Sequence, residues 1–430
     1  MSDTPHFSTL AVHAGQQADP ATGACATPIY QTASFEFQDS DHAARLFNLQ
    51  EFGNIYSRLT NPTVGALEAR VAALEGAPAA LAVASGHAAQ FIVFHTLLSS
   101  GDEILASNKL YGGSVTQLSQ SFKKMGWGAT FIDPTDPENF RKALNDNVKA
   151  IFIESLANPG GIVTDIEAIA QIAHDAGIVL VVDNTLATPY LCRPIEFGAD
   201  IVVHSLTKFM GGQGNSLGGI IVDSGKFDWS ASDKYPTLTM ENASYHGMVF
   251  ADVFGPEMGN IAFAIACRAL GLRDLGPCLS PMNAFLLMNG IETLPLRMEK
   301  HCQNAQAVAE YLQAHDKIEW VSYAGLSDSP YYNLAQKYMP KGAGAVMTFG
   351  VKGGYDAGVQ IVNKVGLFKH LANVGDTRSL IIHPASTTHR QLSEAEQIKA
   401  GAGPDVIRLS IGIEDHGDII ADLDQALETL

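Results

Sequence analysis

The stretch Ile201-Val202-Val203-His204-Ser205-Leu206-Thr207-Lys208 decides the fold of this 430-residue chain. It begins with a continuous β-branched apolar run, which is typical of a strand buried on both faces of a parallel sheet. Polar residues follow at once, and ligands in such sheets bind where the strands end. Lys208 is therefore the first candidate functional residue. A lysine is usually a solvated surface charge; the alternative is an amine buried enough to lose its proton and form a Schiff base.

Similar apolar runs recur along the chain and alternate with helix-like segments such as 64–75, 136–146 and 165–176. This alternation predicts an α/β fold with a mostly parallel, seven-stranded sheet that is covered by helices on both faces. The other six expected strands are 80–84, 103–106, 129–132, 150–153, 178–182 and 219–222.

The chain divides into three expected parts. Residues 1–63 lack a sustained period and are predicted to form an N-terminal arm, and 64–290 form the large α/β domain. An insertion at about 224–260, rich in Gly, Pro and aromatic residues, interrupts that domain and is expected to be a long loop, which is usually functional or disordered. Residues 291–430 are expected to form a smaller α+β domain. We expect helices over 281–315 and 416–429.

Composition excludes several classes of protein. The formal charge is −18, so nonspecific binding to nucleic acid or an anionic membrane is disfavoured, and no apolar run is long enough to span a bilayer. The five scattered cysteines and the absence of a signal-like start predict a cytoplasmic protein. With 46% hydrophobic but only 17% charged residues, the chain also fits an oligomer with extensive buried interfaces.

Four groups of polar residues follow the apolar runs, and three of them suit an anionic, aromatic ligand. Asp183 closes the run 178–182 and could pair with a ring nitrogen, although an Asp there is more often a turn or cap residue. Ser85-Gly86-His87 begins a helix whose free N–H groups suit a phosphate, as do the Ser205 and Thr207 hydroxyls; a simple tight turn is the alternative. The fourth group begins at Glu154.

Other catalytic motifs are missing from the sequence. The glycines Gly212, Gly214 and Gly218 are spaced G-x-G-x-x-x-G and follow Lys208, which does not fit a dinucleotide fingerprint. We find no P-loop, no metal-binding spacing and no Gly-x-Ser-x-Gly element, so no metal is expected and a hydrolase triad is disfavoured.

Together these residues resemble, over essentially the whole chain, the Cys/Met-metabolism pyridoxal-phosphate enzymes of fold type I. The resemblance extends to the sulfhydrylase branch through the 224–260 insertion, with Tyr235-Pro236 and Ser244-Tyr245-His246-Gly247. The motifs that carry it are Tyr56-Ser57-Arg58, Asn61-Pro62-Thr63, Ser85-Gly86, Glu154-Ser155, Asn158-Pro159, Asp183-Asn184-Thr185, Ser205-Leu206-Thr207-Lys208-Phe209, 379–389 and 408–414.

The resemblance implies a role for each site residue. Lys208 would hold pyridoxal 5'-phosphate and shuttle protons, and Tyr111 would stack on the ring and assist proton transfer. Asp183 would pair with the ring nitrogen, Thr185 would contact the ring, and Ser85, Gly86, His87, Ser205 and Thr207 would hold the phosphate. Tyr56 and Arg58 would reach the phosphate of a neighbouring subunit. Arg408, with Asn158 and Ser379, would bind the substrate α-carboxylate.

The implied reaction is a γ-replacement on O-acetyl-L-homoserine by sulfide or methanethiol, giving homocysteine or methionine and acetate. The implied assembly is a tetramer of dimers with active sites shared across each dimer. Alternatives are an O-succinylhomoserine sulfhydrylase, a cystathionine γ-synthase, a γ-lyase, or a non-catalytic scaffold of the same fold. Two residues depart from the family pattern: His87 replaces a usual Met or Gln, and Gln213 replaces a common His.

Overall fold

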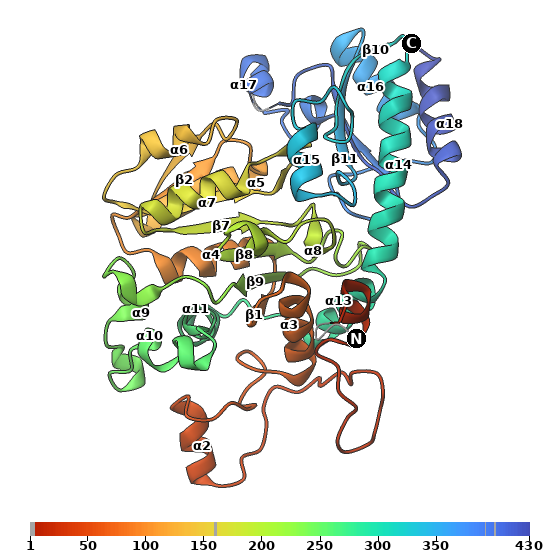
Figure 1. Ribbon diagram of the computed structural model, residues 1–430. Coiled ribbons are helices and arrows are strands. Elements are labelled where there is room, and N and C mark those ends of the chain that lie inside the picture. The colour runs from red at the N-terminus through yellow and green to blue at the C-terminus, as the bar shows by residue number, and fades with distance from the viewer. Residues whose placement is uncertain (1–4, 159–160, 392, 400) are drawn as a thin grey trace.

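The computed structural model describes residues 5–158, 161–391, 393–399 and 401–430 (Figure 1). Residues 1–4 of the expected arm and Pro159 of the Asn158-Pro159 pair lie outside the described residues. The N-terminal segment holds two short helices, α1 (Phe7–His13) and α2 (Ser40–Phe47), joined by irregular chain. Figure 1 shows α2 at the end of an extended excursion away from the large sheet.

The large sheet contains all seven expected strands, in the order β1-β9-β8-β7-β4-β2-β3. The five strands from β8 to β3 pair in parallel, whereas β9 pairs antiparallel with both β8 and β1. The prediction of a mostly parallel sheet is confirmed. The strands are β1 (Ala79–Val83), β2 (Glu103–Ser107), β3 (Gly128–Ile132), β4 (Val148–Glu154), β7 (Val179–Asp183), β8 (Ile201–Ser205) and β9 (Gly219–Asp223).

A separate hydrophobic core covers each face of this sheet because successive side chains along a strand point to opposite faces. Val202 packs into the core that includes α3 (Pro62–Glu75) and α7 (Ile166–Asp175). Val203 packs into the core that includes α4 (Gly86–Leu97) and α11 (Ala262–Ala266). The apolar runs therefore read as continuous because both of their faces are buried.

The 224–260 insertion is folded rather than a free loop. It contains the short helices α9 (Pro236–Thr239) and α10 (Phe250–Val253), which pack on the α11 side of the sheet. Tyr235 is fully buried, and its hydroxyl accepts from Val179 N at 3.0 Å and donates to Lys149 O at 2.8 Å. The aromatic residues of the insertion therefore complete a hydrophobic core.

The C-terminal part forms a five-stranded sheet in the order β10-β11-β14-β13-β12, as expected for a small α+β unit. Helices α16 (Gly354–Lys364) and α18 (His416–Leu427) pack against each other beside it. Its strands are β10 (Ile318–Ser322), β11 (Val346–Val351), β12 (Lys369–His370), β13 (Leu380–Ile382) and β14 (Val406–Ser410).

The expected helix over 281–315 is divided in two. Helix α13 (Pro281–Glu292) ends at Thr293, and α14 (Leu294–Ala314) carries Pro295 in its first turn. Proline lacks a backbone N–H and is favoured at the start of a helix, which explains the break. Helix α14 then runs from beside α13 to the C-terminal sheet (Figure 1).

Within the described residues, every helix is too short or too polar to cross a membrane.

Candidate active site

A cavity lies at the carboxyl ends of the parallel strands, where the sequence places its polar residues. Segments that follow β1, β4, β7 and β8 line it, and residues of the C-terminal part close it from the other side. The lining residues are Ser85, Gly86, His87, Gln90, Tyr111, Glu154, Leu156, Asn158, Asp183, Thr185, Leu186, Ser205, Thr207, Lys208, Leu217, Ala372, Asn373, Val374 and Arg408.

Lys208 is largely buried in this cavity. Its Nζ donates to Asn373 Oδ1 at 2.5 Å. Burial, and then the positive charge of Arg408, lower the pKa of the Lys208 amine from its usual value. A lysine with a lowered pKa exists more readily as the neutral amine, which is the form that attacks a carbonyl or accepts a proton.

The start of α4 offers hydrogen-bond donors to a group of the size of a phosphate. Ser85 is its N-cap, with Oγ accepting from Ala88 N at 3.1 Å, and the first two helical residues, Gly86 and His87, line the cavity. A Cβ on Gly86 would lie 2.9 Å from Ser205 Cβ, so glycine allows α4 to pack closely on the end of β8. The Thr207 hydroxyl, on the same cavity wall, also exchanges hydrogen bonds with the Gly218 backbone.

Asp183 and Glu154 lie side by side, because they are paired across β7 and β4. Burial, and then the charge of Asp183, raise the pKa of Glu154 well above its usual value. The two Glu154 oxygens accept from different turns: Tyr111 N at 2.6 Å and Asn158 N at 3.1 Å. Glu154 therefore holds in place the turn of Tyr111, the candidate ring-stacking residue, and the turn of Asn158, a candidate carboxylate-binding residue.

Arg408 projects from β14 toward the same cavity. It donates to Asn158 Oδ1 and to Asn373 O, each at 3.3 Å. Within the described ranges it forms no ion pair with a carboxylate, so its guanidinium can take the carboxylate of a bound molecule. Asn158 and Arg408 are therefore brought together as the resemblance implies.

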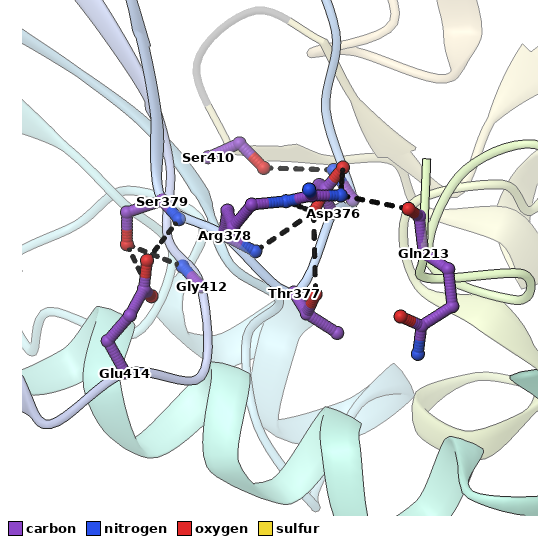
Figure 2. A network of polar contacts seen from close by, with 9 residues as sticks. Gln213, Asp376, Thr377, Arg378, Ser379, Ser410, Gly412 and Glu414 are labelled. Carbon is purple, nitrogen blue, oxygen red and sulfur yellow. Dashed lines mark hydrogen bonds and ion pairs between the residues drawn. The ribbon is translucent and has the colours of Figure 1, made fainter. Parts of the chain in front are cut away.

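Ser379 does not line the cavity, which corrects its expected place beside Arg408. It is fully buried, and its Oγ donates to Glu414 Oε2 at 2.9 Å and accepts from Gly412 N at 2.9 Å (Figure 2). Ser379 N also donates to Glu414, at 2.7 Å. The serine and the glutamate thus join two backbone segments, and the hydroxyl proton is used in that contact.

Asn373 occupies the position that Ser379 was expected to take. The chain reaches Lys208 there because Gly375 has φ +78° and packs on the Lys208-Phe209 peptide, where a Cβ would lie 2.5 Å from Phe209 N. Arg378 anchors the same segment by pairing with Asp376 and donating to Gln213 O (Figure 2). Since Gln213 contributes its backbone oxygen to this contact, the replacement of the common His leaves the contact intact.

Tyr111 and His87 form the aromatic wall. Their ring centroids are 5.9 Å apart, and a Cβ on Gly113 would clash with both rings. Tyr111 is 49% exposed, so one side of its ring is open to the cavity.

Tyr56 and Arg58 lie outside this cavity. Arg58 stacks on the Tyr56 ring at 5.6 Å, donates to Arg273 O, and shares a separate surface hollow with Phe47 and Asp274. The expected contribution to a neighbouring subunit's phosphate site stays a prediction.

Three polar cavity residues were given no role from sequence: Gln90, Glu154 and Asn373. Gln90 follows Gly86 by four residues, one helical turn, so helical spacing could have pointed to it. Asn373 reaches the site through tertiary packing of a distant segment, which no local pattern indicates.

The family model for the Cys/Met metabolism PLP-dependent enzyme matches residues 8–428. The chain belongs to this family. It is 52% identical over 427 residues to O-acetyl-L-homoserine sulfhydrylase of Leptospira meyeri, covering 98% of this chain and 96% of that relative. It is also 49% identical over 428 residues to homocysteine synthase of Schizosaccharomyces pombe, covering 99% of each.

A crystal structure from Campylobacter jejuni, described as an O-acetylhomoserine (thiol)-lyase with N'-pyridoxyl-lysine-5'-monophosphate, superposes with a TM-score of 0.94. It is 44% identical in sequence and covers 99% of this chain and 100% of its own. The resemblance to fold type I inferred from sequence is confirmed, and the chain is that of a pyridoxal-phosphate-dependent enzyme.

The residues of this PLP-dependent enzyme fit the cofactor by their chemistry. The cavity offers an amine for the aldehyde, helix N–H groups and hydroxyls for the phosphate, a carboxylate for the ring nitrogen and an aromatic ring for stacking. Among the described residues, no cluster of three His, Cys, Asp or Glu side chains could hold a metal ion.

Proposed function

We propose that this enzyme catalyses γ-replacement on O-acetyl-L-homoserine, with sulfide or methanethiol as the incoming nucleophile. The products are L-homocysteine or methionine, and acetate. The observation that carries the proposal is full-length similarity to proteins named O-acetyl-L-homoserine sulfhydrylase, combined with a cavity that holds both Lys208 and Arg408.

In this proposal pyridoxal phosphate supplies the electron sink that makes the substrate Cα proton acidic. Lys208 would bind the cofactor, Asp183 would face its ring nitrogen, and Thr185 and Tyr111 would contact its ring. Ser85, Gly86, His87, Ser205 and Thr207 would hold its phosphate. These assignments rest on the cavity geometry and on the family motifs.

Arg408 and Asn158 would hold the substrate α-carboxylate and so orient Cα toward Lys208. Once the substrate amine has displaced it from the cofactor, the free, neutral Lys208 amine would take the proton from Cα, release it, and then take a second proton from Cβ, on a stem flexible enough to reach both. Acetate leaves from Cγ, the thiol adds there, and Lys208 returns the protons. The lowered pKa of the Lys208 amine supports its role as a base.

Charge in the cavity favours the acetyl ester over the succinyl ester. Among the described lining residues, the lysine and arginine side chains are Lys208 and Arg408, and both have roles already. A succinyl group would bring a second carboxylate, without a cation of its own, into a cavity that already holds Glu154 and Asp183.

Steady-state assays would test the proposal, with acetyl or succinyl esters, each with sulfide or cysteine. We expect the highest kcat/KM with the acetyl ester and sulfide. Preference for the succinyl ester with cysteine would instead indicate a cystathionine γ-synthase, and elimination without a thiol would indicate a γ-lyase. A colourless protein that cannot take up pyridoxal phosphate would favour the non-catalytic scaffold.

We also propose a tetramer of two dimers in which Tyr56 and Arg58 complete the partner's site. The support is the position of this pair outside its own cavity, next to the exposed side chain of Phe47. A cytoplasmic location is proposed because Cys192, Cys267 and Cys302 are free and buried, with pKa values raised by burial.

A further inference from the structure

Gln90 is a cavity residue to which the proposed reaction gives no role. It lies on α4, and its side chain is only 5% exposed. Burying a primary amide costs free energy unless its hydrogen-bonding groups find partners. Its contacts therefore need an explanation.

Both contacts of the Gln90 amide are made by its nitrogen. Nε2 donates to Asp183 Oδ2 at 3.3 Å and to Ser114 Oγ at 3.0 Å. An ionised carboxylate only accepts, so the nitrogen must face Asp183, and both of its N–H groups are then used. Gln90 Oε1, also buried, has no hydrogen-bond partner among the described residues. The amide is thus oriented so that its nitrogen contacts Asp183, and its oxygen has no partner among the described residues.

The two oxygens of Asp183 are held by different donors. Thr185 N donates to Oδ1 at 3.0 Å, and Gln90 holds Oδ2. Ser114, in helix α5 (Gly112–Thr116), lies three residues after Tyr111, so Gln90 also links the helix behind the ring-stacking tyrosine to Asp183. Without Gln90, Thr185 N would be the one donor left among the described residues to orient this carboxylate, which lies beside Glu154.

We infer that Gln90 is a positioning residue for the cofactor: its amide, fixed by Ser114, holds the Asp183 carboxylate in the orientation that meets the cofactor ring nitrogen. The inference rests on the role proposed above for Asp183. It does not depend on which ester or thiol the enzyme uses.

The test is the dissociation constant of pyridoxal 5'-phosphate from the purified enzyme after cofactor removal, followed by absorbance and fluorescence. Gln90→Leu removes the donor and keeps the volume, whereas Gln90→Glu keeps the shape and places a carboxylate against Asp183. We expect cofactor affinity to fall about tenfold in Q90L and further in Q90E, as the loss of a hydrogen bond to a charged group predicts. If Gln90 only filled space, Q90L would bind the cofactor with the affinity of the wild type.

Ser114→Ala tests the link to α5. It should weaken cofactor binding less than Q90L does, and the double variant should bind no worse than Q90L alone. Gln171→Leu is the matched control, because Gln171 donates to Asp175 at 2.7 Å on the exposed surface; its affinity should equal that of the wild type. Thermal unfolding of each cofactor-free variant shows that the fold is retained.

Wild-type affinity in Q90L or in Q90E would overturn the inference, as would additive losses in the double variant. Asp183→Asn distinguishes this failure from failure of the proposed function. If D183N binds the cofactor normally, the role of Asp183 is wrong and the inference falls with it. If D183N binds weakly while Q90L and Q90E bind normally, only the role of Gln90 is wrong.

Discussion

Asn373 Oδ1 accepts a hydrogen bond from Lys208 Nζ at 2.5 Å, while Asn373 O accepts one from Arg408 Nη2 at 3.3 Å. One residue from the C-terminal part therefore contacts both the candidate base and the candidate carboxylate-binding group. Asn373 therefore holds both groups in place, although Lys208 follows a strand of the large sheet and Arg408 lies on a strand of the C-terminal sheet.

Replacing Asn373 with aspartate should shift the pH dependence of turnover. Burial and Arg408 keep the Lys208 pKa low, so the neutral amine is present above that lowered value. A carboxylate at hydrogen-bond distance favours the protonated amine, and the acidic limb of the kcat profile should move up by about one pH unit or more. Asn373→Ala, which adds no charge, should lower kcat without that shift. Superimposable profiles for N373D and wild type would contradict the account.

Arg408→Lys should weaken substrate binding. A lysine is a single charged point and cannot maintain contacts with Asn158, Asn373 and a carboxylate together. We expect KM for O-acetyl-L-homoserine to rise roughly 10- to 100-fold, which corresponds to losing a charged hydrogen bond. Arg141→Lys, at an exposed ion pair, is the matched control. A fall in kcat at constant KM would show that Arg408 does not bind the carboxylate in the ground state.

Ser379→Ala should reduce stability and leave substrate binding nearly unchanged. The hydroxyl joins Glu414 to Gly412 in the buried network of Figure 2, so its removal leaves buried polar groups unpaired. The expected loss in the free energy of unfolding is about 1–3 kcal/mol, measured by chemical denaturation. A tenfold increase in KM with unchanged stability would instead support the carboxylate-binding role that the family resemblance implies.

Mixing two inactive variants should restore activity if sites are shared between subunits. In a mixed dimer, one chain carries Arg58→Ala and the other carries Lys208→Ala. If Arg58 acts in the partner's site, both defects fall in one of the two active sites, and the other site is intact. Refolding an equal mixture should recover about a quarter of wild-type activity. An inactive mixture that has demonstrably exchanged subunits would mean that Arg58 does not act across a dimer.

The large sheet could be predicted from sequence because its strands are buried on both faces. Runs such as Ile201-Val202-Val203 are then continuously apolar, and the polar residues that follow four of the runs line the cavity: Ser85, Glu154, Asp183 and Ser205. Lys208 and Asp183 follow directly from this pattern. Arg408 and Asn158 were paired only through the family resemblance, since they are 250 residues apart.

Ser379 and Asn373 show where sequence reasoning failed. Ser379 begins the C-terminal motif 379–389 and Asn373 lies shortly before it, but which of them faces the cavity depends on the turn at Gly375 and on the Ser379–Glu414 contact. The prediction of a loop at 224–260 was wrong for a different reason. Its Gly and Pro content indicated a loop, whereas its buried aromatic residues pack it onto the sheet. Tertiary packing decided each case.

The central claim is that the cavity around Lys208 is the site of the cofactor, and one measurement tests it most directly. The purified yellow enzyme is reduced with borohydride, digested, and its peptides are analysed by mass spectrometry. We predict a single pyridoxyl-modified lysine, Lys208, and no modified peptide in Lys208→Ala treated in the same way. A pyridoxyl group on any other lysine, or an enzyme that turns over substrate with Lys208 replaced, would contradict the account.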